Sequence, residues 1–436
     1  MFKPPTKVIN KEYNIPFIAL SVIFFMLPVG GKALPIAIFL FVLMSLMFGD
    51  WSSWKTNFSK VSKIYVPLLL FYSLYIIGFF ISDETDSALK QLEHKVSFFL
   101  FPFLMPLVKV SDKQRDTLFK LFILGCTMIC VVSFLHFFYV SIFLDEYCIL
   151  GEKPEGNRIG TAIEYLSNHF IVVNVHRTYF SMYLLLAVYY IVFDLLGQPR
   201  PRGNKNMKKL IMELLALLML ASVIFCVQSK IIVGLLVVSG IVLPIFSPIS
   251  IRKKIIFILS FLVLTFAFKE TLYSRFNNSI QQIKYILSPG KDQNKSFTNQ
   301  LRPGSTEIRY ILYKSAIQLI EEKPIFGYGT GDVKKVLRVQ NEKNKFTSIA
   351  HLNYGPHSQV LEVLIGSGII GFLVLLSVFF CPIIEGIRFK NYFMVAFALA
   401  IFFCCLIESF LTRQDGIILT SLFISVFASI SKKEHI

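Results

Sequence analysis

The sequence predicts an all-α, polytopic membrane protein, and three observations support this class. The 436 residues are 55% hydrophobic and only 16% charged, too few charges to cover the apolar surface of a soluble protein of this length. Apolar stretches recur along the chain, with roughly the 17–25 residues that a bilayer core requires of a helix. Lysine and arginine lie in short runs between these stretches.

We expect about twelve transmembrane helices. The candidate spans are residues 14–30, 33–49, 64–82, 96–109, 117–144, 171–196, 209–227, 231–247, 254–269, 365–384, 391–407 and 415–431. Lys3, Lys7 and Lys11 give the first span the look of a signal peptide, but no convincing cleavage site follows, and we interpret it as a retained helix. The fourth is short and contains Pro102 and Pro106, which predicts a kinked or partly re-entrant segment.

The basic runs predict the orientation, because positive residues in short loops mark the cytoplasmic side. Every even-numbered connection is basic, whereas the loops "SDETDSALKQLEH", "DEYCILGEKPEGNR" and "ESFLTRQD" on the other side are acidic or nearly uncharged. Both termini are therefore expected in the cytoplasm. Topology accounts for the net charge of +17, so we expect no nucleic-acid partner.

The spans divide the chain into three parts. Residues 1–269 hold the first nine helices, residues 270–364 form a long outer loop, and residues 365–436 hold the last three helices. The loop contains "STEIRYILYKSAIQLIEEKP", in which apolar residues recur at helical spacing between a cap at Ser305 or Thr306 and a stop at Pro324. This predicts an amphipathic helix that lies on the bilayer or roofs the bundle.

Neither a disulfide framework nor a metal site is predicted. Six of the seven cysteines lie in apolar segments, and Cys148 stands alone in a loop. No Asp-x-Asp pair occurs on the outer side, and the spacing of "DETD" (83–86) suits a solvated loop better than a metal site. A diphosphate bound on this side would be balanced by arginine and lysine.

Cationic residues occur at separate points along the outer side. His176 and Arg177 lie near the start of the sixth span, in "NVHRTYFSMYLL", where a charge needs a polar cavity or reaches the headgroups. Lys230 follows Gln228 and Ser229 in the turn "CVQSKIIVGLL", which is either a functional turn or an ordinary interfacial one. Arg309 lies on the loop helix, either in a site or on a solvated face.

Three further features lie in the outer loop. Arg275 and Arg302 are placed there, more simply explained as solvated residues. The segment "PIFGYGTGD" carries Gly327, Gly329 and Gly331 and looks like a nucleotide fingerprint. No strand precedes it and no βαβ unit surrounds it, so we interpret it as a flexible turn that shapes the loop.

The segment "HSQVLEVLIGSGIIG" (357–371) contains a titratable ring, Glu362 and three glycines. We expect His357 in the first turn of a helix, where the positive helix end opposes protonation and keeps the imidazole neutral. A neutral imidazole can accept a proton, although a plain interfacial histidine is the simpler alternative. The glycines Gly366, Gly368 and Gly371 allow close helix packing and can interrupt the helix near the surface.

In their order along the chain, these motifs resemble the bacterial O-antigen ligase and O-antigen polymerase superfamily. The motifs are an arginine-bearing span, a Ser-Lys turn, an "R-x-x-L/I-Y" helix, "PIFGYGTGD" and the "H-S-x-x-L-E" segment with its glycines. The resemblance is specific over 305–375, weaker over 170–240, and limited to hydropathy in the first 150 residues. It implies a GT-C type inner-membrane glycosyltransferase with a large periplasmic loop and no metal or other cofactor.

The resemblance also implies residue roles. His357 corresponds to the general base, and Arg177, Lys230 and Arg309 to cations that hold the diphosphate of an undecaprenyl-diphosphate-linked glycan. Many relatives have arginine where Lys230 stands, so the bidentate fork is lost there. His176, Arg275 and Glu362 are possible supporting residues. The implied reaction is metal-independent and inverts the anomeric carbon.

Several functions stay open at this stage. The leading one is a ligase that transfers the glycan to a lipid A-core acceptor. The alternatives are an O-antigen polymerase that joins lipid-linked repeats, and a protein O-oligosaccharyltransferase. A transporter or flippase would keep charges at mid-membrane, whereas here they lie at the outer boundary. A scaffold gives no reason for the outer cations. Oligomeric state, sugar and linkage are not predicted.

Overall fold

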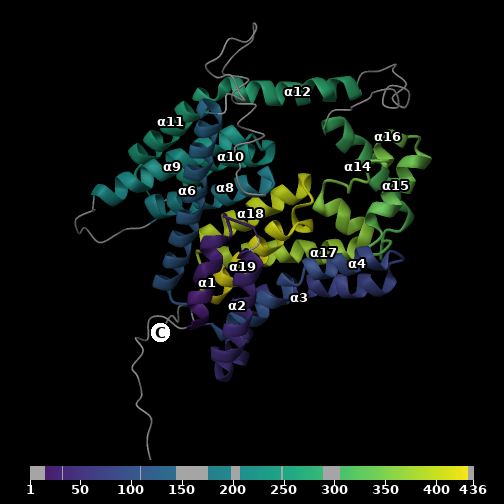
Figure 1. The fold of residues 1–436 in the computed structure, drawn as a ribbon, viewed down its shortest axis with the longest axis horizontal. Coiled ribbons are helices and arrows are strands. Elements are labelled where there is room, and N and C mark those ends of the chain that lie inside the picture. Colours follow the sequence, from purple (N-terminus) through teal and green to yellow (C-terminus); the bar gives the residue numbers. More distant parts are fainter. Residues whose placement is uncertain are drawn as a thin grey trace, which may run out of the picture.

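A computed structural model describes residues 15–31, 33–108, 110–143, 175–197, 207–246, 249–287 and 305–430. Within these ranges every long regular element is a helix (Figure 1). Five of the helices are long and apolar enough to cross a membrane, and five shorter helices are also apolar. The predicted class, a polytopic all-α membrane protein, is confirmed.

The helices follow the predicted apolar stretches closely. In chain order they are α1 (Ile15–Met26), α2 (Ala33–Phe48), α3 (Trp54–Ile81), α4 (Thr85–His94), α5 (Ser97–Leu104), α6 (Asp112–Phe143), α8 (Arg177–Gly197), α9 (Met207–Val227), α10 (Lys230–Phe246), α11 (Ile251–Ala267), α12 (Lys269–Leu287), α14 (Ser305–Glu322), α15 (Val333–Lys343), α16 (Thr347–Ala350), α17 (Gln359–Arg388), α18 (Tyr392–Ile407) and α19 (Gln414–Ile430). Cys148 and Arg302 lie outside the described residues.

Two of the twelve predicted spans look different in the structure. The fourth, 96–109, is the eight-residue helix α5 followed by a short 3-10 turn at Met105–Leu107. At about 1.5 Å per residue α5 is too short to cross a bilayer, and Pro102 and Pro106 lie in these two elements as the prediction of a broken segment requires. The ninth predicted span, 254–269, corresponds to α11. None of the residues of α11 is buried against the other helices.

The main apolar core lies where α19 and α8 pass through the middle of the bundle. Phe423 and Phe427 of α19 pack against Phe119 of α6 and Phe397 of α18, with ring centroids between 5.3 and 5.8 Å apart. Aromatic packing at these separations adds to the gain from apolar burial. Most residues of α8 and α19 are buried among the other helices of this core.

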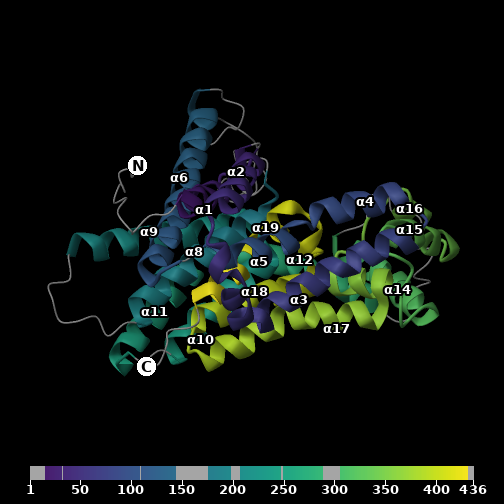
Figure 2. The ribbon, with the colours of Figure 1, turned by 90° about the horizontal axis from the view of Figure 1, so that it is seen from below.

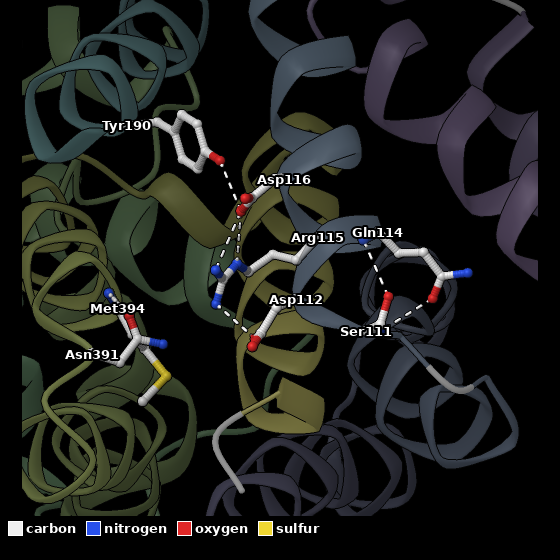
Figure 3. Close-up of polar contacts among 8 residues, drawn as sticks. All are labelled: Ser111, Asp112, Gln114, Arg115, Asp116, Tyr190, Asn391 and Met394. Carbon is white, nitrogen blue, oxygen red and sulfur yellow. Dashed lines mark hydrogen bonds and ion pairs between the residues drawn. The ribbon is translucent and has the colours of Figure 1, made fainter. Parts of the chain in front are cut away.

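A polar cluster fixes one end of this bundle (Figure 3). Arg115 at the start of α6 bridges Asp112 at 3.5 Å and Asp116 at 3.2 Å, and the Tyr190 hydroxyl of α8 donates to Asp116 at 3.1 Å. Nearby, Asn391 caps α18 by accepting from the Met394 N–H at 3.2 Å. Tyr190 lies thirteen residues beyond Arg177, about 20 Å along the helix, so Arg177 and the end of α18 lie at the opposite end of the bundle.

A second, smaller core lies at that opposite end. Figures 1 and 2 show α14, α15 and α16 gathered with α4 beside the start of α17. Ile311, Leu312 and Leu319 of α14 pack against Leu337 of α15 and Ile365 of α17. The predicted helix of the outer loop is therefore confirmed as α14, and its apolar face is buried in this small core.

The glycine-rich turn "PIFGYGTGD" is inserted into a break in α17. The backbone of α17 leaves the helical conformation at Gly368, with φ 60° and ψ −157°. Tyr328 and Gly329 donate backbone N–H bonds to the carbonyls of Ile365 and Gly366 at 2.8 and 2.9 Å, and Ile369 donates to Pro324 at 2.9 Å. The segment thus replaces helical hydrogen bonds lost at the break.

Two consequences follow for the sequence-based interpretation. The prediction that the glycines of 357–371 interrupt a helix is confirmed at Gly368. The turn at 324–332 was expected to be flexible, and this is corrected, because it is hydrogen-bonded to α17 on one side and to the residues just before α4 on the other. The Asp332 carboxylate accepts the backbone N–H groups of Asp83 and Glu84 at 2.9 and 2.8 Å.

Candidate functional site

His357 lies at the junction between the two cores. It precedes Ser358, the N-cap of α17, whose hydroxyl accepts from the Leu361 N–H at 3.4 Å. His357 is thus just outside the helix and not in its first turn, which corrects the expectation. Its φ of 51° is uncommon for a residue with a side chain. The Tyr313 hydroxyl donates to the His357 carbonyl at 3.4 Å.

A carboxylate joins His357 to Arg309. Glu408, directly after α18, forms an ion pair with Arg309 of α14 through its Oε1. Its other oxygen, Oε2, lies 4.0 Å from Nδ1 of His357. All three side chains are partly exposed, so a ligand can reach them.

The backbone around Glu408 is held by α17. The Gln359 N–H donates to the Glu408 carbonyl at 3.2 Å, and the Gln359 side chain accepts from the Leu411 N–H at 2.7 Å. Gln359 is fully buried. Because His357 and Ser358 directly precede Gln359, the same short segment positions both the imidazole and the carboxylate that faces it.

The electrostatics favour a neutral imidazole. Burial lowers the pKa of His357 below its usual value, Glu408 opposes this shift, and the positive charge of Arg309 adds to it. A histidine with a lowered pKa is mainly neutral near pH 7 and can accept a proton. A neutral imidazole was expected from the positive end of the helix. The lowered pKa comes mainly from burial instead, and His357 lies outside the helix.

His176 and Arg177 reach the same region from α8. Burial lowers the pKa of His176, and the charges of Arg413, Glu408, Arg177 and His357 all act on it. Tyr179, in the first turn of α8, donates a hydrogen bond from its hydroxyl to the Ser409 carbonyl at 3.4 Å. The structure thus brings His176 and Arg177 to the segment that carries Glu408.

Lys230 and Arg275 lie in different surroundings, whereas Glu362 interacts with Ser409, the residue after Glu408. Lys230 begins α10, and its Nζ donates to the Ser279 hydroxyl of α12 at 2.5 Å. Arg275 lies on α12 as well. Glu362 is in the first turn of α17 and interacts electrostatically with the fully buried Lys95, whose Nζ lies 4.3 Å from the Tyr75 ring centroid.

Glu408 and Arg413 are site residues that the sequence analysis did not select. Both occur in "ESFLTRQD", which was used only as a weakly charged outer loop. The available signal was position, because Glu408 follows the last residue of an apolar span on the side where the other candidates lie. Within the described ranges, no group of three or more His, Cys, Asp and Glu residues is placed to hold a metal ion.

The fold and the site together define a multi-pass membrane protein with a histidine, a carboxylate and arginines gathered at one end of its helix bundle. Residues 214–376 match the family model described as O-antigen ligase. Over this range, which is less than half of the chain, the sequence is similar to the O-antigen ligase family. The range contains Lys230, Arg309 and His357, whereas Arg177 and Glu408 lie outside it.

A relative among curated proteins matches part of the chain. An uncharacterized protein of Haemophilus influenzae is 27% identical over 165 residues. The alignment covers 36% of this chain and 39% of that protein.

Proposed function

We propose that the chain is an O-antigen ligase-like glycosyltransferase that moves a glycan from undecaprenyl diphosphate to a lipid A-core acceptor. The observation that carries this proposal is the arrangement of His357, Glu408 and Arg309. It joins a proton acceptor, a carboxylate that orients it and a cation at one partly exposed place. The O-antigen ligase domain over 214–376 supports the same reaction class.

His357 is the proposed general base. Its Nδ1 faces Glu408, so a proton on Nδ1 leaves Nε2 with a lone pair for the acceptor hydroxyl. The separation of 4.0 Å is longer than a hydrogen bond, and distances of this kind shorten when substrate is bound. Glu408 then stabilises the imidazolium that forms.

The proposed reaction is a single displacement that inverts the anomeric carbon. The acceptor hydroxyl gives its proton to His357 while its oxygen attacks C1 of the donor sugar. The bond from C1 to the diphosphate oxygen breaks, and undecaprenyl diphosphate leaves with both bonding electrons. Arg177 and Arg309 are the proposed cations that stabilise the negative charge on the leaving oxygen.

The proposed setting is the bacterial inner membrane, with both termini in the cytoplasm and the site facing the periplasm. The basic runs of the sequence support this orientation. In this arrangement residues 1–269 and 365–436 form the membrane part, and residues 270–364 form the periplasmic part. A site at one end of the bundle suits a donor whose lipid tail stays in the bilayer.

The pH dependence of transfer tests the base assignment. The value of kcat/KM for glycan transfer should fall at acidic pH as His357 becomes protonated. Glu408 raises the pKa of His357 and Arg309 lowers it, so Glu408→Gln should move the acidic limb to lower pH, and Arg309→Gln should move it to higher pH. If the acidic limb moved in the same direction in both variants, His357 would not be the titrating base.

Purified enzyme with defined acceptors tests the substrate class. The protein in detergent is incubated with undecaprenyl-diphosphate-linked glycan and one acceptor at a time. The acceptors are lipid A-core, a second lipid-linked repeat and an acceptor protein. Transfer only to lipid A-core is the expected result. Product formed only with lipid-linked repeats would replace the ligase by an O-antigen polymerase, and product formed only on protein would make it an O-oligosaccharyltransferase.

A further inference from the structure

The first turn of α8 packs against the start of α19 and the residues just before it. The Tyr179 ring of α8 stacks on Phe410 with centroids 4.8 Å apart, and its hydroxyl bonds to the Ser409 carbonyl. Gly416 of α19 allows this approach, because a Cβ there would lie 2.8 Å from Cε1 of Tyr179. Arg177 and Arg413 are therefore close neighbours in the fold, since one begins α8 and the other directly precedes α19.

The backbone also fixes Arg413. Its carbonyl accepts the N–H groups of Gly416 and Ile417 at 3.2 and 3.1 Å, which makes Arg413 the residue on which α19 starts. The side chain is exposed, and that of Arg177 is half-buried. The charges of both arginines act on His176, as do those of Glu408 and His357, so His176 links the two arginines to the region of the proposed catalytic pair.

These arginines differ from the other cations of the site in their partners. Arg309 is ion-paired with Glu408, and Lys230 donates to Ser279. Among the described residues neither Arg177 nor Arg413 forms an ion pair, although Asp415 interacts electrostatically with Arg413. Two guanidinium groups without an ion-pair partner at one partly exposed point are a strong match for an anion.

We propose that Arg413 is a further substrate-binding residue, and that Arg177, Arg413 and His176 form the main cradle for the donor's diphosphate. This assignment rests on the proposed function and deepens it. Each guanidinium fork can bind one phosphate group bidentately, so the cradle selects a lipid diphosphate over a monophosphate. Arg309, held by Glu408, then contacts the diphosphate from the side of His357.

Binding measured without turnover tests the cradle. In a His357→Asn parent, affinity for undecaprenyl diphosphate and for undecaprenyl phosphate is measured in detergent, and Arg413→Ala, Arg413→Lys and Arg338→Ala are each added to the parent. Arg338 is an exposed arginine of α15 and matches the change in charge. Arg413→Ala should weaken diphosphate binding by roughly 10–100-fold, and monophosphate binding by less.

Each other outcome has a distinct meaning. Arg413→Lys keeps the charge and loses the fork, so it should bind with intermediate affinity and confirm that the variants fold. If Arg413→Ala and Arg338→Ala bound the diphosphate equally well, the cradle would be wrong while the proposed function stood. If the parent bound neither lipid, the proposed function would fail and the cradle with it.

Discussion

Replacement of His357 by alanine is expected to lower the transfer rate by about 10²–10⁴-fold, the usual contribution of a positioned general base. The reason is that neither Arg309 nor Arg177 can accept the proton of the acceptor hydroxyl, since both guanidinium groups stay charged. The lipid donor should still bind, because the proposed diphosphate contacts are made by other residues. The measurement is the initial rate of glycan transfer by purified protein.

Two further variants separate catalysis from folding. His357 has a φ of 51°, which asparagine tolerates better than alanine, so His357→Asn should fold normally and still lack the base. His351→Ala is the matched control, because His351 is an exposed histidine of the same outer segment. Full activity of His357→Asn, or an equal loss in His351→Ala, would remove His357 from the mechanism.

The largest expected effect on stability comes from Gly368→Ala. The backbone there has φ 60° and ψ −157°, a region open essentially to glycine alone, and an added Cβ would lie 2.2 Å from the Ile325 carbonyl oxygen. Strain and collision together should cost more than about 3 kcal/mol. Thermal unfolding of the purified protein in detergent should show a midpoint several degrees lower.

Gly234→Ala provides the control for this measurement. Gly234 lies inside α10, and a Cβ added there meets no atom within 4 Å. Alanine favours the helix over glycine by up to about 1 kcal/mol, so the midpoint should stay the same or rise slightly. Equal midpoints for the two variants would mean that α17 runs through residue 368 without the break.

Much of the fold could be predicted from the sequence because hydrophobic length is a strong local signal. The apolar runs gave α1, α2, α18 and α19 within a few residues. The predictions were weaker where tertiary contacts decide the conformation. The start of α17 at Gln359 depends on the cap by Ser358, and the break at Gly368 depends on bonds from a segment about forty residues away.

The candidate site shows the same division. His357, Arg309, Arg177 and His176 were selected from their place on the outer side, and the structure brings them to one region. Glu408 was missed because nothing local marks a single glutamate after an apolar span as the partner of a distant arginine and histidine. Lys230 was grouped with the others by charge, and its contact with Ser279 of α12 could not be read from the turn in which it lies.

The hydrogen bonds between 324–329 and α17 make the outer segment and the membrane helix mutually dependent. Ile365 and Gly366 are buried, and a buried backbone carbonyl without a donor is costly. The carbonyls of Ile365 and Gly366 accept N–H groups from Tyr328 and Gly329. The final conformation of α17 therefore forms only after segment 324–329 has packed against it. The outer segment therefore cannot be excised or grafted as a module, because α17 would lose the hydrogen-bond partners of its broken turn.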